Sequence, residues 1–117
     1  MRQPHSNRYP DTPYGSATLA VSQRIGPGST LASEYVDVQR DYVKSFGFRG
    51  NQRGSWYIDA TMVGTQRVFT ILQGTFPAGP GTLTMASFTE VVRAARARIR
   101  YSVAGSASIY YGGQAPS

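Results

Sequence analysis

The chain has 117 residues, a length that predicts a single domain with one modest core. It contains no cysteine and only one histidine, His5, so we expect no disulfide, no thiolate or histidine metal site and no Ser-His-Asp triad. The formal net charge is +6, and Lys44 is the only lysine among 12 basic residues. Such a preference for arginine is typical either of bidentate pairs at interfaces or of a coding bias. No apolar run approaches the ~20 residues that a membrane helix needs.

Residues 1–15, MRQPHSNRYPDTPYG, predict an extended arm that precedes the folded domain. The segment contains three prolines and almost no aliphatic side chains, a composition that favours a polyproline-like chain over a secretory signal. Two interpretations stay open: a disordered tail, or an arm that becomes ordered on a neighbouring subunit. In the second, Tyr9 and Tyr14 are the anchors, and Arg2 and Arg8 join them as partner-binding residues. Residues 16–117 form the predicted domain.

Short segments that alternate apolar and polar side chains predict seven or eight β-strands. Turn signals of glycine, proline and polar residues separate them about every 8–12 residues. The predicted strand segments are residues 16–25, 30–38, 42–48, 56–63, 67–72 (short and apolar) and 83–88, followed by 96–103 and 107–111. Residues 90–97 are compatible with one or two helical turns, but we favour a strand or an irregular segment because Val91 and Val92 are β-branched.

The last two segments, residues 96–103 and 107–111, show the clearest pattern. In the first of them the apolar residues share one face of a strand, and arginines alternate with them on the other face. A turn at residues 104–106 then leads to Ala107, Ile109 and Tyr111, which resume the alternation. We therefore predict a closing β-hairpin that carries a row of arginines on its outer face.

Together these elements predict an all-β fold: a single β-sandwich of jelly-roll type with an extended N-terminal arm. Two packed sheets would bury the apolar face of each strand. The predicted core residues are Phe46, Phe48, Trp56, Ile58, Leu72, Ile99 and Tyr101.

The acidic residues do not form a catalytic pattern. The six carboxylates are Asp11, Glu34, Asp37, Asp41, Asp59 and Glu90, and their spacing couples no two of them into the pair that a glycosidase needs. The glycines at 47, 50 and 54 lack the Walker spacing and its Lys-Ser/Thr. We therefore expect carboxylates that face solvent or pair with arginine, and we predict no catalytic residue, no cofactor and no metal.

Four arginines, Arg93, Arg96, Arg98 and Arg100, form the sharpest chemical feature, a predicted partner-binding basic face. Three interpretations stay open: a contact face for phosphate backbones, a surface that pairs with acidic groups of another subunit, or a solvated outer sheet face. Nucleic-acid binding on a sheet usually adds exposed stacking aromatics, which Tyr57 or Tyr110 would supply. A sugar platform would instead need Trp56 with Tyr57, or Tyr110 with Tyr111, but a single tryptophan in mid-strand is more typical of a core.

Five motifs follow one another along the chain: SEYVDV (33–38), FGF (46–48), GSWYIDA (54–60), VFTIL (68–72) and ARARIRYSVAGSA (95–107). In this order they resemble small β-sandwich domains of bacteriophage virion proteins, over roughly residues 30–111. The resemblance implies a structural module of a virus particle, and it implies no catalytic residues.

On this resemblance and the two features above, we expect a structural protein of a bacteriophage virion rather than an enzyme. It would be a capsid-associated minor, decoration or vertex protein that works by oligomerisation and arm-mediated contacts. Its partners would be the major capsid protein or further copies of itself, as a homo-oligomer, with no membrane. One alternative is a tail, baseplate or fibre-attachment module, with or without a glycan ligand. A second is a nucleic-acid-binding protein that uses the arginine face.

Overall fold

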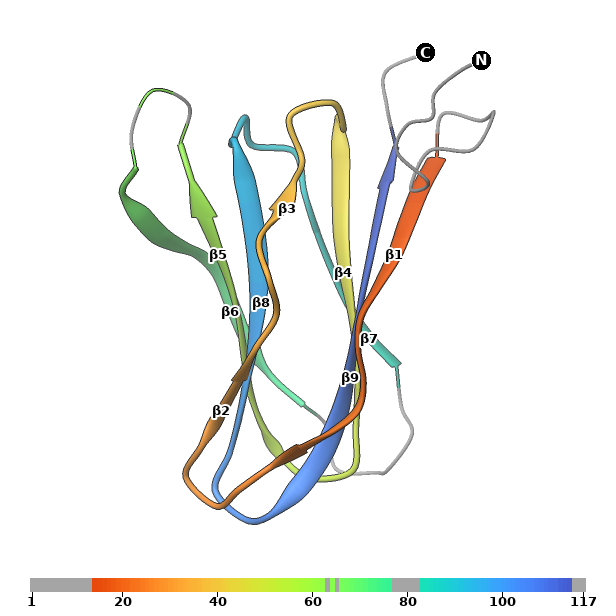
Figure 1. The fold of residues 1–117 in the computed structure, drawn as a ribbon, viewed down its shortest axis with the longest axis vertical. Coiled ribbons are helices and arrows are strands. Elements are labelled where there is room, and N and C mark those ends of the chain that lie inside the picture. Colours follow the sequence, from red (N-terminus) through yellow and green to blue (C-terminus); the bar gives the residue numbers. More distant parts are fainter. Residues whose placement is uncertain (1–13, 63, 65, 77–82, 115–117) are drawn as a thin grey trace.

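A computed structural model describes residues 14–62, 64, 66–76 and 83–114, with side chains from residue 17 onward. The described residues form nine strands in two antiparallel sheets that face one another (Figure 1). The strands are β1 (Tyr14–Ile25), β2 (Thr30–Ala32), β3 (Val36–Asp37), β4 (Val43–Gly50), β5 (Gly54–Thr61), β6 (Val68–Thr75), β7 (Leu83–Phe88), β8 (Ala94–Tyr101) and β9 (Gly105–Gln114). The predicted β-sandwich is thus confirmed. In this part of the chain, no helix has the length and apolar character needed to cross a membrane.

The strand pairs are nested along the chain. The first sheet has the order β1-β9-β4-β7, and the second has the order β2-β8-β5-β6, with β3 also paired to β8. Hence β1 pairs with β9, β2 and β3 with β8, β4 with β7, and β5 with β6, as if one long antiparallel ribbon had been folded over. This nesting is the order of the described strands, and the jelly-roll type stays a prediction.

The core lies between the sheets and contains the residues expected there. Phe46, Phe48, Ile58, Ile99 and Tyr101 are fully buried. The other two predicted members, Trp56 and Leu72, are partly buried and pack against this core. Trp56 stacks on Phe48, with 5.3 Å between ring centroids and 22° between ring planes. The alternation in the sequence therefore assigns the inward faces correctly.

The predicted closing hairpin is wrong. β8 lies in the second sheet and β9 in the first, and the short connection at residues 102–104 crosses from one layer to the other (Figure 1). Both strands bury one apolar face, and a short turn joins two such strands equally well within a sheet or across the core. Tyr101 fixes the crossing, since its hydroxyl donates to the carbonyl of Ser106 at 2.8 Å and accepts from the backbone N–H of Asn51 at 3.2 Å.

The segment predicted as one strand over residues 30–38 is divided into β2 and β3. At the interruption, the Ser33 side chain takes the place of a backbone carbonyl: its hydroxyl oxygen accepts from the N–H of Ala97 at 3.0 Å and donates to the carbonyl of Glu34 at 2.9 Å. A serine hydroxyl that competes with the ladder in this way lets the edge strand bend without leaving a buried donor unpaired.

The predicted arm lies mostly outside the described residues, as do Arg2, Arg8 and Tyr9. β1 begins at Tyr14, within the range assigned to the arm, and the backbone of Tyr14 pairs with Gln114. The boundary between arm and domain, between residues 15 and 16, stays a prediction. The first strand starts at Tyr14, two residues before the predicted start at residue 16.

Candidate functional site

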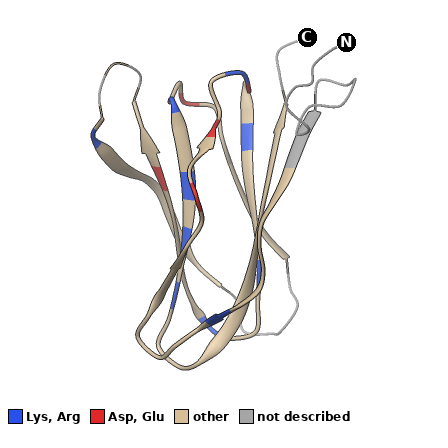
Figure 2. Cartoon of the chain, viewed as in Figure 1, with Lys and Arg blue, Asp and Glu red and all other residues tan. Residues whose placement is uncertain are grey.

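The arginine row lies on the outer face of the second sheet. β8 is an inner strand of that sheet, between β2 and β5, and its inward residues Ala95, Ala97 and Ile99 are fully buried. The alternate positions therefore point away from the core, and Figure 2 shows basic positions along β8 beside an acidic position on β5. In the register of β5 with β8, Arg96 faces Asp59, and Arg98 faces Tyr57.

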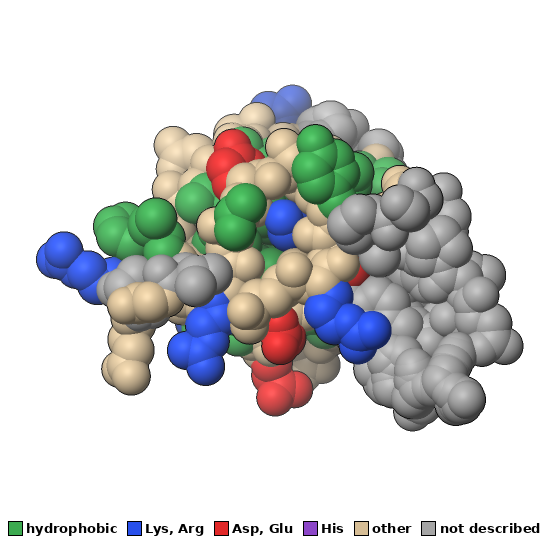
Figure 3. Space-filling model, turned by 90° about the horizontal axis from the view of Figure 1, so that it is seen from above, with side chains coloured by type: hydrophobic (Ala, Val, Ile, Leu, Met, Phe, Trp, Pro, Cys, Tyr) green, Lys and Arg blue, Asp and Glu red, His purple; other side chains and the backbone are tan. Residues whose placement is uncertain are grey.

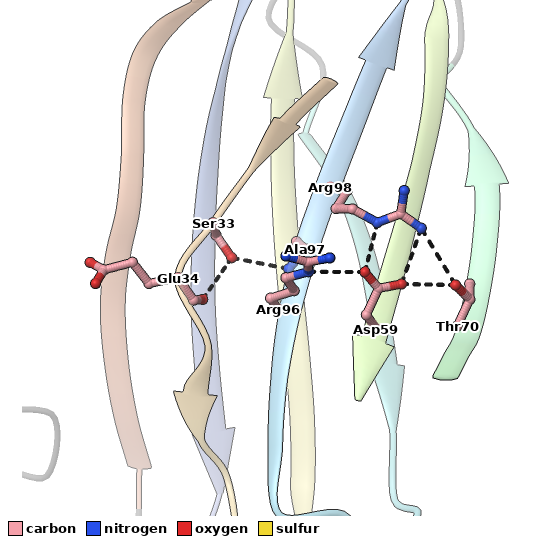
Figure 4. Close-up of polar contacts among 7 residues, drawn as sticks. All are labelled: Ser33, Glu34, Asp59, Thr70, Arg96, Ala97 and Arg98. Atoms are coloured by element: carbon pink, nitrogen blue, oxygen red, sulfur yellow. Dashed lines mark hydrogen bonds and ion pairs between the residues drawn. The ribbon is translucent and has the colours of Figure 1, made fainter. Parts of the chain in front are cut away.

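Asp59 is the centre of a hydrogen-bonded cluster that joins three strands (Figure 4). Its side chain is 2% exposed, yet it lies on the outer face, because Arg96 and Arg98 cover it. Arg98 binds it side-on, with Nε to Oδ2 at 2.6 Å and Nη2 to Oδ1 at 3.1 Å. Nε of Arg96 donates to Oδ2 at 3.0 Å, and the Thr70 hydroxyl donates to Oδ1 at 2.8 Å. Each carboxylate oxygen thus accepts two hydrogen bonds, which fills its usual capacity.

A bulge between β5 and β6 brings Thr70 into this cluster. Ile58 pairs with Leu72, so an unbroken antiparallel register would place Ile71 opposite Asp59, but the register shifts there and Asp59 pairs with Thr70. A bulge re-aims one side chain relative to the ladder. Here it replaces an apolar neighbour of the carboxylate with a hydroxyl donor.

Two tyrosines support the guanidinium groups of the cluster. The Arg96 guanidinium carbon lies 5.0 Å from the ring centroid of Tyr35, and that of Arg98 lies 4.6 Å from the ring centroid of Tyr57. Arginine favours such stacking because its planar cation is attracted by the ring face. Each guanidinium is therefore held on one side by the carboxylate and on its face by a ring.

The charge state of the Asp59 carboxyl follows from its burial and from these neighbouring groups. Burial by itself would raise the pKa of this carboxyl, but hydrogen bonds from Arg98, Thr70 and Arg96 outweigh burial and bring the pKa below its ordinary value. The carboxylate is therefore ionised throughout the neutral range, and its charge is shared between two arginines, so the cluster has a net positive charge.

Part of each guanidinium stays available to a partner. Arg96 and Arg98 are 31% and 27% exposed, and within the described residues the Nη1 and Nη2 groups of Arg96 and the Nη1 group of Arg98 donate no hydrogen bond. Arg100 is exposed one row further along, and its Nη2 donates to the carbonyl of Gly28 at 3.4 Å. Arg93 is exposed in the connection before β8, outside the row. The structure thus brings three of the four predicted arginines onto one face.

The aromatic residues considered for other functions do not gather there. Tyr57 lies on the arginine face, but the Arg98 guanidinium covers its ring. Tyr110 belongs to β9 in the first sheet, because the two last strands form no hairpin. Trp56 packs on the core while Tyr57 points outward, and Tyr111 is buried, so neither adjacent pair forms a flat platform of two rings.

Sequence reasoning missed Asp59 as the partner of the arginines. The alternation in β5 places Asp59 on the outer face, which is a usable signal, but Asp59 and Arg96 are 37 residues apart and meet only if β5 pairs with β8. The strand order was not predictable from the sequence. Among the described residues, no group of three or more His, Asp or Glu side chains is placed to hold a metal ion.

Comparison with known proteins identifies the fold and no sequence family. No protein-family model matches the sequence, and no curated protein matches it. The crystal structure of the PBSX exported protein XepA matches with a TM-score of 0.71 and 13% identity, over 87% of this chain and 37% of that one. The crystal structure of PirA matches with a TM-score of 0.50 and 7% identity, over 92% of this chain and 97% of that one. This chain therefore corresponds to well under half of XepA. At these identities the similarity is one of fold.

Proposed function

We propose that this protein is a structural protein of a bacteriophage particle, associated with the capsid, that works by binding copies of itself or a neighbouring capsid protein. The arginine face of the second sheet, defined as Arg96, Arg98 and Arg100, would be one contact surface, and residues 1–15 would be another. The proposal joins the resemblance of the sequence motifs to virion β-sandwich domains with the geometry around Asp59.

The observation that carries the proposal is the fixed position of two partly exposed guanidinium groups, those of Arg96 and Arg98. Binding usually requires long side chains to lose rotamer freedom, at about 0.5–1.5 kcal/mol for each one immobilised. Asp59 and the two tyrosine rings have already removed most of this freedom from Arg96 and Arg98. The unused N–H groups are therefore oriented donors for carboxylate or carbonyl oxygens of a partner.

The arginine face also differs from a surface made for nucleic acid. A phosphate-binding face gains from many mobile cations and from open aromatic rings that stack with bases. Here one carboxylate neutralises part of the charge, and Arg98 covers the ring of Tyr57. These features support a protein partner with carbonyl or acidic groups over a nucleic acid.

Sedimentation velocity with the nucleic-acid-free protein, over a range of concentrations and at low and high salt, tests this proposal. We expect a defined oligomer. The variant Arg96→Gln/Arg100→Gln should self-associate roughly tenfold more weakly. Arg98 is left unchanged so that Asp59 keeps one cation. Weaker association of this variant then reports on the interface and not on a destabilised fold.

The matched control is Arg24→Gln/Arg53→Gln, which removes the same charge from two exposed positions outside the face. It should associate as the wild type does. Equal association of the two variants would exclude the arginine face as a contact. A chain that stays monomeric at every concentration would exclude self-association. Binding to a capsid protein would then be the part of the proposal left to test.

A further inference from the structure

The outer face of the first sheet has a hollow that the arginine face does not involve. Its volume is ≈ 320 Å³, within the range of small ligand pockets, and it lies over β4, β7 and β9. Gly47 forms its floor: a methyl group added there would lie 3.4 Å from Leu83 and 3.8 Å from Tyr110. Met85, which is 62% exposed, completes an apolar wall. The absence of a side chain at Gly47 thus leaves room for an apolar group between Leu83 and Tyr110.

One charged group lies at the rim of this hollow. Arg49 lines it and is exposed, and within the described part of the chain its guanidinium has no ion pair or hydrogen bond. A ligand that matches the hollow would therefore carry a compact apolar ring group followed closely by a negative charge. Apolar hollows that present an aromatic ring, as Tyr110 does here, suit proline-rich extended segments, because such segments have little conformational entropy to lose.

The chain contains one segment with this chemistry outside the described residues. Tyr9-Pro10-Asp11 offers two rings and then a carboxylate, and Asp11 is the only acidic residue among residues 1–15. Tyrosine and proline rings suit the wall of Leu83 and Tyr110. The Asp11 carboxylate would then lie beside Arg49, so apolar and charged groups match in the same order.

The position of β1 decides which copy of the chain supplies the segment. Tyr14 begins β1 at the edge of the first sheet, and the row of Gly47 and Tyr110 continues to Thr18 of β1. The arm of the same chain would fold back from Tyr14 with Asp11 first and Tyr9 last, whereas Gly47 lies nearer to the Tyr14 end of the sheet than Arg49 does. It would therefore present its charged and apolar groups in the reverse order.

We infer that the hollow of the first sheet binds the Tyr9-Pro10-Asp11 segment of a second copy of this chain. The inference rests on the proposed function and specifies its arm contact. Each copy would then give an arm and receive one, through a face opposite to the arginine face.

Mixed-label NMR on the full-length chain tests this inference. Because the chain has no cysteine, Thr12→Cys carries a nitroxide at a single position, beside the segment. Spin-labelled copies without ¹⁵N are mixed with ¹⁵N-labelled copies that have the natural sequence and no spin label. We expect strong loss of amide signal at Gly47, Met85 and Tyr110 and a much weaker effect at Tyr57, on the opposite sheet about 10 Å further away.

Charge variants give the control. Arg49→Asp in the ¹⁵N-labelled copies should abolish the signal loss, and Asp11→Arg in the spin-labelled copies should restore it. Signal loss that appears only when the nitroxide and ¹⁵N are on one chain would overturn the inference. If sedimentation shows an oligomer but the hollow shows no signal loss, the inference fails and the proposed function stands. If the chain is monomeric and the hollow is unaffected, the inference and the self-association part of the proposed function both fail, and binding to a capsid protein is the part left to test.

Discussion

At the scale of single residues, Asp59 determines the character of the arginine face. A buried carboxylate without partners would cost several kcal/mol, but this one accepts four hydrogen bonds, three of them from arginines. It neutralises one of the two cations and positions both. Arg96 and Arg98 therefore differ from ordinary surface arginines, whose ion pairs contribute little because the side chains are mobile and solvated.

The lowered pKa of Asp59 predicts a particular loss of stability in acid. The pKa in the folded protein lies below the value of about 3.9 expected for an unfolded chain. The contribution of Asp59 to the free energy of unfolding is therefore complete above about pH 4 and is lost as the pH falls through the folded value. In Asp59→Asn the contribution is absent at all pH values, so its stability should be lower at pH 7 by about 1–3 kcal/mol and should fall less steeply below pH 4.

Urea unfolding at a series of pH values from 7 to 2 measures both effects. Glu34→Gln serves as the control, because it removes an exposed carboxylate that makes no side-chain bond within the described residues. Its curve should follow that of the wild type. Parallel curves for Asp59→Asn and the wild type would show that the carboxylate does not titrate differently in the folded protein.

At the scale of elements, the sequence predicted which residues form strands and which way they face, but not which strands are neighbours. Alternation is a local property, so it placed Ile58 inward and Asp59 outward correctly. Pairing is a property of the whole fold. The exchange of layers between β8 and β9 and the bulge opposite Asp59 both depend on contacts distant in sequence, and neither changes the local pattern.

Three glycines near Tyr101 illustrate the same difference between a local pattern and a contact distant in sequence. In the sequence, Gly50, Gly54 and Gly105 lie between alternating segments, where glycine predicts a turn. In the structure, a methyl group at Gly50, Gly54 or Gly105 would lie 2.0, 2.6 or 2.8 Å from atoms of the Tyr101 ring or hydroxyl. These glycines therefore leave the space that the buried ring fills, a role that no spacing in the sequence reveals.

The hydrogen bonds of the Tyr101 hydroxyl allow a prediction of how much they stabilise the crossing between the sheets. In Tyr101→Phe the ring still fills its space, but the carbonyl of Ser106 and the N–H of Asn51 lose the hydroxyl and keep only their direct hydrogen bond, at 3.3 Å. Loss of the hydroxyl should lower the free energy of unfolding by about 0.5–1.5 kcal/mol and speed hydrogen exchange at the Asn51 amide. Chemical denaturation and amide exchange measure the two quantities.

Tyr110→Phe is the matched control, because the Tyr110 hydroxyl makes no hydrogen bond to the described residues. Its free energy of unfolding should stay within about 0.5 kcal/mol of the wild type. Equal losses in the two variants would mean that the Tyr101 hydroxyl adds nothing to the crossing.

At the scale of the whole molecule, exposed apolar side chains gather at the end of the sandwich where β1 begins. Tyr42, Met62 and Val91 lie in the connections at this end and are 60%, 49% and 81% exposed. Figure 3, which looks onto this end, shows hydrophobic side chains between charged groups. A small domain that leaves such groups exposed gains stability when a partner covers them. Contacts of the arm and of this end would therefore act together.

Removal of residues 1–13 tests whether the arm serves assembly alone. The backbone pairing of β1 with β9 starts at Tyr14, so the shortened chain keeps every strand of the sandwich. Its free energy of unfolding should stay within about 0.5 kcal/mol of the full chain, while its sedimentation coefficient should fall to that of a monomer. A chain whose residues 1–13 are replaced by Gly and Ser at equal length should behave like the shortened one, since length without anchors gives no contact. A shortened chain that fails to fold would place residues 1–13 within the domain, and one that assembles normally would leave the arginine face as the sole contact of the proposed assembly.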